Sequence, residues 1–249
     1  MTGRANEMAD PDDRRSEIAA NLAAVESRIR TACEAAGRTR DEVILVAVTK
    51  TFPASDVELL AALGIRDMGE NRHQEAAAKV AACVAAGLTE LRWHFVGQVQ
   101  TNKAGVVASY ADVVHSVDRI RLVTALERAA RSHGRTLTAL VQVDLEPVAD
   151  SAARGRGGAD ADETTAVAAA IEASESLVLG GVMGIAPLGG DPSEAFARLE
   201  TAGRALRASY PHARMVSAGM SGDLEAAIAH GATHLRIGTA LLGSRPSLG

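Results

Sequence analysis

The chain has 249 residues and a formal net charge of −5, with hydrophobic residues at 47% and charged residues at 23%. Its length is close to the roughly 250 residues typical of a (β/α)8 barrel, and its composition excludes a disordered chain. Acidic and basic residues are mixed along the sequence, which argues against nucleic acid or an anionic membrane as a partner, because both require clustered basic residues.

The sequence shows no sign of membrane insertion, secretion or disulfide bonding. No apolar run reaches the length of a membrane span, and Met1–Arg15 is polar rather than signal-like. The two cysteines, Cys33 and Cys83, form no CxxC motif and have no histidine at metal-ligand spacing. We therefore expect a reduced, cytoplasmic protein that does not associate with membranes.

The N-terminal region divides into a tail and a helix. Met1–Asp13 lacks apolar periodicity and is expected to be a mobile tail. In Arg14–Gly37, apolar residues recur at helical spacing from Ile18 onward, and Gly37 is a typical helix stop. A barrel domain over residues 14–249, opened by an extra helix, is therefore expected.

Strand-like and helix-like segments alternate through the rest of the chain. The apolar, strand-like segments are Val43–Thr49, Asp67–Glu70, Arg92–Val96, Asp112–Val117, Thr138–Asp144, Leu177–Ile185, Arg214–Ser217 and His234–Ile237. The helix-like segments are Ser55–Leu63, Arg72–Ala86, Arg119–His133, Asp160–Ser174, Ser193–Ser209 and Gly222–His230, with a weaker pattern over Gln100–Ala108. This alternation predicts a parallel α/β sheet, and eight strands favour a single closed (β/α)8, TIM-like barrel. An open doubly wound sheet is the alternative, but no GxGxxG follows the first strand.

Lys50 is the first candidate for chemistry. It ends the apolar run of the first strand, and active sites of such barrels lie at the carboxyl ends of the strands. An amine in that position is expected to be partly desolvated, which favours the neutral nucleophile that forms an imine. Taken alone, however, a strand-end lysine is more often a side chain that extends to water.

Two glycine-containing loops follow the last two strands and resemble a phosphate cradle. The first contains Ser217, Gly219, Met220 and Ser221, and the second contains Gly238 and Thr239. Barrels often bind phosphate with these loops, because glycines let the backbone approach the anion while N–H groups and hydroxyls donate hydrogen bonds. Ser221 could also cap the helix expected from Gly222. Asp223 would repel a phosphate and is expected to point away.

Arg236 stands at the end of the eighth strand, beside that cradle. A guanidinium that faces a pyridine nitrogen donates a hydrogen bond without losing its proton, so the ring stays unprotonated and is a poorer electron sink. An ordinary ion pair with a strand-end acid is the competing interpretation.

The remaining polar candidates carry weaker signals. Asn71, after the second strand, could bond a ring substituent or cap the following helix. His94 lies on the apolar third strand, where a satisfied core histidine is the more common case. Asn102, beyond that strand, fits helix capping as well as function. The sequence contains no Gly-x-Ser-x-Gly elbow, HExxH or P-loop.

Taken together, these residues form a series of blocks that resembles the YggS/PROSC-type pyridoxal phosphate homeostasis proteins. The blocks run in order over almost the whole chain: Ala47–Thr51, Gly69–Glu75, Trp93–Lys103, Gly181–Pro187, Ser217–Asp223 and Arg236–Ala240. The resemblance implies a fold-type III barrel, related to the N-terminal domain of alanine racemase, with pyridoxal 5'-phosphate (PLP) bound to Lys50 as a Schiff base.

The resemblance also implies a role for the other candidate residues. Ser217–Ser221 and Gly238-Thr239 would hold the phosphate, Arg236 would face the pyridine nitrogen, and Asn71 would lie beside the ring. The protein would store and deliver the cofactor in vitamin B6 homeostasis, with other B6 vitamers as further ligands and PLP-dependent apo-enzymes as candidate recipients.

Some positions depart from the family pattern. Asp144 stands where the family commonly has Asn, and a basic, glycine-containing element, Arg154–Gly158, lies within an enlarged loop. That loop, Glu146–Asp162, is expected at the carboxyl-terminal mouth of the barrel, either as a lid or as a disordered segment. His73 replaces a more usual aliphatic residue.

A low-activity amino-acid racemase is the main alternative function. Racemisation needs two bases, one on each face of the bound substrate. In alanine racemase the second base is a tyrosine from a C-terminal β-domain of the partner subunit, and this sequence is expected to lack that domain. Tyr110 and Tyr210, the two tyrosines, fall before strands, at the wrong end of the barrel. We therefore expect a monomeric carrier without efficient turnover. A barrel that binds another sugar or nucleotide phosphate is the third possibility.

Overall fold

Eight parallel strands close into one barrel in chain order, with β8 pairing back onto β1. The protein is described here by a computed structural model that covers residues 11–146 and 157–243. The strands are β1 (Ile44–Val48), β2 (Asp67–Glu70), β3 (Arg92–Phe95), β4 (Val113–Val117), β5 (Leu137–Gln142), β6 (Leu177–Met183), β7 (Met215–Ser217) and β8 (His234–Ile237). The closed (β/α)8 barrel expected from the sequence is confirmed, and the open doubly wound sheet is excluded.

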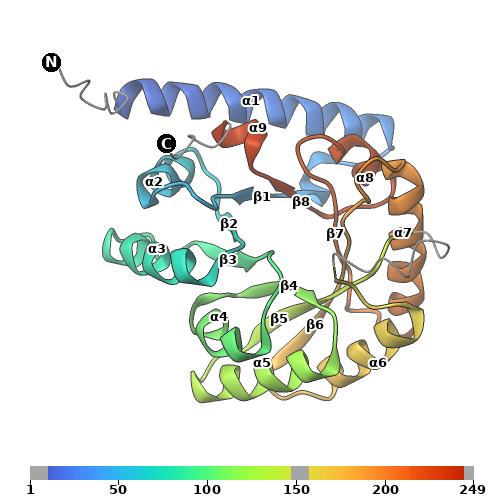
Figure 1. Cartoon of the computed structure of the whole chain (residues 1–249). Coiled ribbons are helices and arrows are strands. Elements are labelled where there is room, and N and C mark those ends of the chain that lie inside the picture. The colour runs from blue at the N-terminus through green and yellow to red at the C-terminus, as the bar shows by residue number, and fades with distance from the viewer. Residues whose placement is uncertain (1–10, 147–156, 244–249) are drawn as a thin grey trace, which may run out of the picture.

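Helices surround the strands on the outside of the barrel (Figure 1). They are α1 (Pro11–Ala35), α2 (Ala54–Ala62), α3 (His73–Ala85), α4 (Ala104–Tyr110), α5 (Ile120–Ser132), α6 (Ala161–Glu172), α7 (Pro192–Ser209), α8 (Leu224–Ala229) and α9 (Thr239–Leu242). Two short 3-10 turns, η1 (Arg40–Glu42) and η2 (Thr101–Lys103), lie before β1 and α4.

Several boundaries differ from the sequence prediction. The first helix begins at Pro11, so residues 11–13 are helical rather than part of a tail, and the rest of the predicted tail lies outside the described residues. Most of the predicted loop Glu146–Asp162 also lies outside them. Its last part is ordered against the barrel, because Ala159 forms a parallel bridge with Val143. The segment Gln100–Ala108 is indeed helical, as η2 followed by α4.

Successive side chains along each strand point alternately toward the helices and into the barrel. Residues that point outward, such as Leu45 and Ala47, belong to the large apolar cluster between strands and helices. Residues of the other parity point into the barrel: a Cβ placed on Gly69 would touch the side chains of Val46 and Val48. Because Lys50 shares the parity of Val46 and Val48, β1 directs the lysine toward the barrel axis.

The N-terminal helix fastens the last two loops of the barrel. Arg28 donates a hydrogen bond to the Ser221 carbonyl at 3.0 Å and forms an ion pair with Glu225 in α8. Arg14 donates to the carbonyl of Leu242 in α9 at 3.1 Å. The helix lies along α8 and α9 in Figure 1. This extra helix therefore holds in place the two segments in which the sequence predicts a phosphate site.

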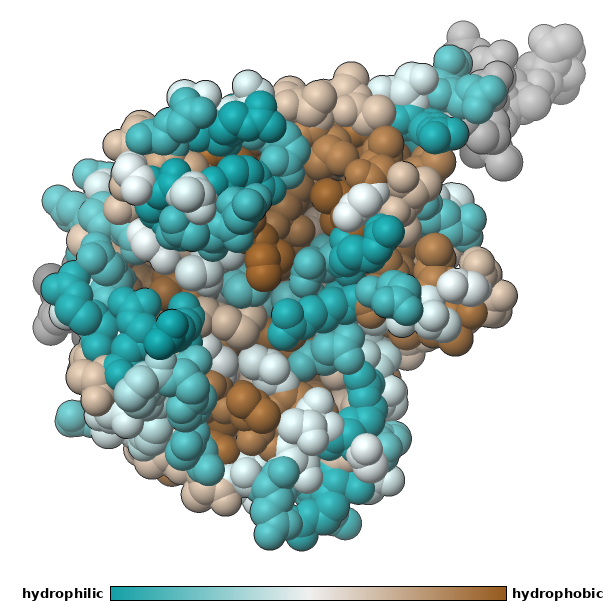
Figure 2. Space-filling model, turned by 180° about the vertical axis from the view of Figure 1, so that it is seen from behind, coloured by the Kyte–Doolittle hydropathy of each residue, from teal (hydrophilic) through white to brown (hydrophobic). Residues whose placement is uncertain are grey.

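The surface seen from the opposite side is largely hydrophilic, with several separate hydrophobic areas (Figure 2). Within residues 11–146 and 157–243, no helix is long and apolar enough to cross a membrane. The same part of the chain contains no group of three or more histidine, cysteine or acidic side chains arranged to hold a metal ion.

Gly181 provides a test of the β6–β7 contact. It has a φ of +147°, and a Cβ at this position would lie 1.9 Å from the Met215 carbonyl oxygen. We expect Gly181→Ala to destabilise the protein by about 2–4 kcal/mol in urea unfolding, because backbone must move to relieve the clash. The control, Gly105→Ala in α4, meets nothing within 4 Å and should stabilise slightly, by about 0.5 kcal/mol. Equal effects of the two substitutions would contradict this description of the barrel wall.

Candidate functional site

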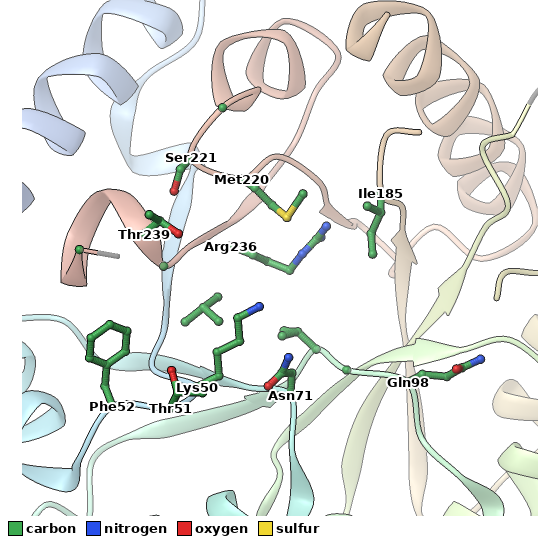
Figure 3. A pocket seen from close by; sticks show the side chains of 16 residues that line it. Lys50, Thr51, Phe52, Asn71, Gln98, Ile185, Met220, Ser221, Arg236 and Thr239 are labelled. Atoms are coloured by element: carbon green, nitrogen blue, oxygen red, sulfur yellow. The ribbon is translucent and has the colours of Figure 1, made fainter. Parts of the chain in front are cut away.

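A cavity of about 640 Å³ opens at the carboxyl ends of the strands, where the sequence predicts the site. Of the predicted residues, Lys50, Asn71, Met220, Ser221, Arg236, Gly238 and Thr239 line it. In Figure 3 the Lys50 amine and the Asn71 amide point into the space below Arg236, Met220 and Thr239, whereas Gln98 points away. Residues from both ends of the sequence are thus brought to one cavity of a size usual for small-molecule sites.

Lys50 follows β1 directly and stands before an unusual backbone conformation. Thr51 has a φ of +68°, and it is the only non-glycine residue with positive φ in the described chain. A β-branched residue in this region is strained, and such strain is concentrated at functional sites. The Thr51 N–H donates to the Glu75 carboxylate at 3.3 Å, which holds the turn. Lys50 itself is exposed rather than partly desolvated, so the environment predicted from the sequence was wrong on this point.

The sequence contains only three lysines, and Lys50 is the one that lines the cavity. Lys79 in α3 is buried, where its amine donates to the Glu70 carboxylate and, at 2.6 Å, to the Thr49 carbonyl. Lys103 lies in η2, away from the cavity lining. The Lys79–Glu70 pair holds the strand ends immediately before Lys50 and Asn71, so it supports the site without entering it.

Asn71 carries a buried acceptor without a partner. Its Oδ1 makes no hydrogen bond within the described residues, although the atom is inaccessible. The residue does not cap the following helix, because the N-cap position of α3 is Arg72. Gly97 packs against the Asn71 backbone, where a Cβ would lie 2.4 Å from the Asn71 carbonyl oxygen. An unsatisfied side-chain acceptor on a residue that lines the cavity indicates a place for a ligand donor.

The two glycine-containing loops meet at Ser221. Its Oγ accepts a hydrogen bond from the Ala240 N–H at 3.1 Å, so Ser221 caps α9 rather than the helix that follows it in sequence. Asp223 folds back on its own loop, where its Oδ1 accepts from the Met220 N–H at 2.6 Å. Asp223 does not line the cavity, as predicted. The polar groups left at the wall are backbone and hydroxyl groups of Ser221, Gly222, Gly238 and Thr239.

Ser217 and Gly219 lie behind the cavity wall rather than on it. Ser217 is fully buried, and its hydroxyl is within 2.6 Å of Arg236 Nη1 and 2.8 Å of His115 Nδ1. Gly219 has a φ of +87° and packs where a Cβ would lie 2.6 Å from the Ala227 Cβ. In this structure Ser217 supports Arg236 and Gly219 allows the loop to turn, and the contact of both residues with a phosphate stays a prediction.

Arg236 brings a buried charge to the cavity. Its guanidinium donates to the Ser217 hydroxyl and, at 2.9 Å, to the Gly184 carbonyl, so its contacts are neutral groups rather than the strand-end acid considered in the competing interpretation. Burial lowers the pKa of Arg236 to about 10, partly offset by the charge of Asp223. The side chain remains charged at neutral pH and keeps further N–H donors for a ligand.

The barrel interior below Arg236 contains buried histidines, and the sequence marks only His94 among them as a candidate. His94 is a satisfied core residue, as predicted: its Nε2 lies 2.8 Å from Asp67 Oδ1 and its Nδ1 lies 2.8 Å from His115 Nε2. His115 and Asp67 were not singled out from the sequence. Their inward parity on β4 and β2 was the available signal, but parity alone does not predict which inward side chains meet.

Because these interior histidines are buried, we expect the folded protein to lose stability as the pH falls. Burial lowers the pKa of His94, takes that of His115 well below its ordinary value, and lowers that of His234 to about 3. As the pH falls below about 6.5, the unfolded chain binds protons that the folded chain does not, so stability falls by up to about 1.4 kcal/mol per pH unit for each histidine. Asp67 does not add to this loss near neutral pH: its burial raises its pKa, but the hydrogen bond and charge of His94 outweigh burial and leave the pKa below its ordinary value.

Urea unfolding between pH 7.5 and 5 measures this loss of stability. We expect a clear decrease over the range, with a shallower decrease for His234→Gln, which removes one of the three groups. A free energy of unfolding that does not change between pH 7 and 5 would contradict neutral, buried histidines.

Comparisons with known proteins identify the family of this chain. A sequence model of the alanine racemase N-terminal domain matches residues 20–246. The pyridoxal phosphate homeostasis protein of Mycobacterium tuberculosis (strain H37Rv) is 48% identical over 249 residues, which cover 94% of this chain and 95% of the relative. The structure of PipY from Synechococcus elongatus with PLP bound has a TM-score of 0.77 and 34% identity, covering 91% of this chain and 100% of PipY. Alanine racemase from Corynebacterium glutamicum, at 15% identity and a TM-score of 0.65, shares the fold over 94% of this chain and 62% of the racemase. The chain belongs to the alanine racemase N-terminal domain family and, within it, to the pyridoxal phosphate homeostasis proteins.

Proposed function

We propose that this protein binds PLP as a Schiff base on Lys50 and acts in intracellular PLP homeostasis by storing and delivering the cofactor. The observation that carries the proposal is the arrangement around one cavity: a lysine amine on one wall, a buried arginine on another, and two glycine- and hydroxyl-containing loops between them. The PLP-bound structure of PipY supports the choice of ligand.

The residues present fit the cofactor chemically. Asn71 Oδ1 is a buried acceptor that lacks a partner among the described residues, and it lies on the same wall as Lys50. Serine and threonine hydroxyls with glycine backbone N–H groups are suited to a phosphate. A cavity of about 640 Å³ is within the range of small-molecule sites. When bound, the cofactor supplies an aldehyde that condenses with a primary amine.

Each wall then has a distinct role. Lys50 anchors the ligand, and the strained turn at Thr51 fixes where the anchor leaves the strand. Ser221, Gly222, Gly238 and Thr239 hold the phosphate, with α1 securing their loops. Arg236 would lie toward the pyridine nitrogen and would donate a hydrogen bond to it. Ser217 and Gly219, which the resemblance assigns to the phosphate, support the site from behind.

The same walls favour a carrier over an enzyme. The described cavity lining contains no tyrosine, histidine or carboxylate that could act as a second base beside Lys50. Tyr110 is buried at the end of α4, and Tyr210 follows α7 at the amino-terminal side of β7. Burial raises the pKa of the Tyr110 hydroxyl far above its ordinary value. Because Arg236 keeps its proton, it would also leave the ring of a bound cofactor a weak electron sink. We therefore propose that efficient racemisation does not occur.

We further propose that the protein is a cytoplasmic monomer that accepts other B6 vitamers and passes PLP to PLP-dependent apo-enzymes. The state of the cysteines supports a reducing compartment: Cys33 and Cys83 are free and buried, and burial raises the pKa of both thiols, which keeps them unreactive. The cavity opens to solvent beside the exposed Lys50, which suits exchange of a bound ligand.

Substitution of the lysines tests the anchor. Wild-type protein incubated with PLP should become yellow, and borohydride should fix the chromophore to the Lys50 peptide in a mass-spectrometric digest. Lys50→Ala should remain colourless after dialysis, whereas Lys103→Ala, the matched control outside the cavity, should behave as wild type. A colourless wild type, or a fixed adduct on another residue, would contradict PLP anchoring at Lys50.

An assay of amino-acid racemisation tests carrier against enzyme. We expect the PLP-loaded protein to racemise alanine no faster than Lys50→Ala supplied with the same concentration of free PLP, because no second base lies in the described lining. Conversion of L-alanine to D-alanine, followed by chiral chromatography, is the measurement. A rate more than about tenfold above that control would establish the racemase alternative.

A further inference from the structure

A continuous series of side-chain hydrogen bonds crosses the barrel interior from the base of β2 to Arg236. The members are Asp67 on β2, His94 on β3, His115 on β4, Ser217 on β7 and Arg236 on β8. The successive atom pairs are Asp67 Oδ1 with His94 Nε2, His94 Nδ1 with His115 Nε2, and His115 Nδ1 with Ser217 Oγ, each at 2.8 Å, and Ser217 Oγ with Arg236 Nη1 at 2.6 Å. We call this set the Asp67–Arg236 chain.

The chemistry of its two ends sets the direction of every bond. Arginine can only donate, so the Ser217 oxygen accepts from Arg236 and its own proton is free for His115 Nδ1. His115 must then carry its proton on Nε2, which donates to His94 Nδ1. His94 in turn carries its proton on Nε2 and donates to the Asp67 carboxylate. Each donor in the chain thus has an acceptor, with both histidines neutral and both in the Nε2–H form.

The opposite direction leaves a group unsatisfied. If Asp67 were protonated and donated to His94, both histidines would carry their protons on Nδ1, and Ser217 would accept from His115 and from Arg236. Its buried hydroxyl proton would then have no acceptor within the chain, at a cost of about 1–3 kcal/mol. Hydrogen bonding to His94 also lowers the pKa of Asp67 despite the cost of its partial burial, which favours the ionised acceptor.

We propose that Asp67, His94 and His115, acting through Ser217, are positioning residues that fix the guanidinium of Arg236 at the cavity wall. The Ser217 hydroxyl and the Gly184 carbonyl hold one N–H on each terminal nitrogen, which leaves the other N–H groups to face a ligand. Successive bonds that point the same way polarise one another, so the Asp67 carboxylate stabilises the buried cation through four intervening hydrogen bonds. The effect of this positioning on PLP affinity rests on the proposed function, whereas the positioning of Arg236 itself does not.

His234 is an interior histidine that lies outside the Asp67–Arg236 chain. It is buried, and its ring centroid lies 6.1 Å from that of His94, yet its bonded partner is the neighbouring Thr233 hydroxyl and its Nε2 is unsatisfied within the described residues. His234→Gln therefore perturbs the same interior without breaking the chain, and it is the matched control.

Nitrogen NMR of the protein without cofactor tests the positioning directly. Long-range 15N–1H spectra should show His94 and His115 as neutral Nε2–H tautomers, and Arg236 should give separate Nη signals because rotation of its guanidinium is hindered. In Ser217→Ala the Arg236 signals should merge, whereas His234→Gln should retain them. An Nδ1–H tautomer at His115, or unchanged Arg236 signals in Ser217→Ala, would overturn the proposal.

Affinity for PLP tests the consequence. Ser217→Ala and Asp67→Ala should each bind PLP about tenfold more weakly than wild type, as expected for loss of one hydrogen bond to a charged group. Asp67→Asn keeps an acceptor for His94 and should restore affinity to within about threefold, and His234→Gln should stay within about twofold of wild type. Equal affinities for Ser217→Ala and His234→Gln would overturn the link to the ligand. A wild type that binds no PLP would refute the proposed function instead, and the tautomers would still decide the positioning.

Discussion

Burial of the Arg236 charge inside the barrel is the constraint on which the site depends. A guanidinium removed from water is costly unless its donors find acceptors, and here they find a serine hydroxyl and a backbone carbonyl rather than a carboxylate in direct contact. The serine is in turn supported by His115, His94 and Asp67. The inner layer of the barrel is therefore partly a polar network, in place of the branched aliphatic filling usual for this fold.

The two faces of the sheet accordingly carry different kinds of residues. Outward-facing residues form the large apolar cluster with the helices, which supplies most of the buried hydrophobic surface. A smaller apolar cluster of Val113, Leu140 and Met183 occupies part of the interior. The remaining inward positions are free to carry polar side chains toward the carboxyl ends of the strands, where Lys50 and Asn71 line the cavity.

Local pattern was enough to predict much of the fold and part of the site. Position at the carboxyl ends of strands placed Lys50 and Arg236 at the mouth, and glycine-containing loops marked the last two turns. The start of α1 was missed, although Pro11 with Asp12 and Asp13 is a typical helix start. The bond from Ala240 to Ser221, the role of Ser217 and the contact between His94 and His115 depend on strands that meet only when the barrel closes. No local sequence signal shows which of these distant residues meet. The exposure of Lys50 likewise depends on how the loops at the mouth of the barrel assemble.

The network also connects stability with function. Neutral histidines, a buried lysine–glutamate pair below Lys50, and a strained threonine beside it all have costs that a purely structural barrel would avoid. Their common position, below or beside one cavity, is explained if they hold an amine and a guanidinium at fixed places around a flat, anionic ligand. The cofactor proposed here has that shape and charge.

The most direct test is a crystal structure of the protein soaked with PLP. We predict continuous density between the cofactor and Lys50 Nζ, the phosphate between the Ser221 and Thr239 loops, and Arg236 facing the ring nitrogen while still bonded to Ser217. A cofactor bound elsewhere, or bound in this cavity with Arg236 turned away from the ring, would contradict this prediction.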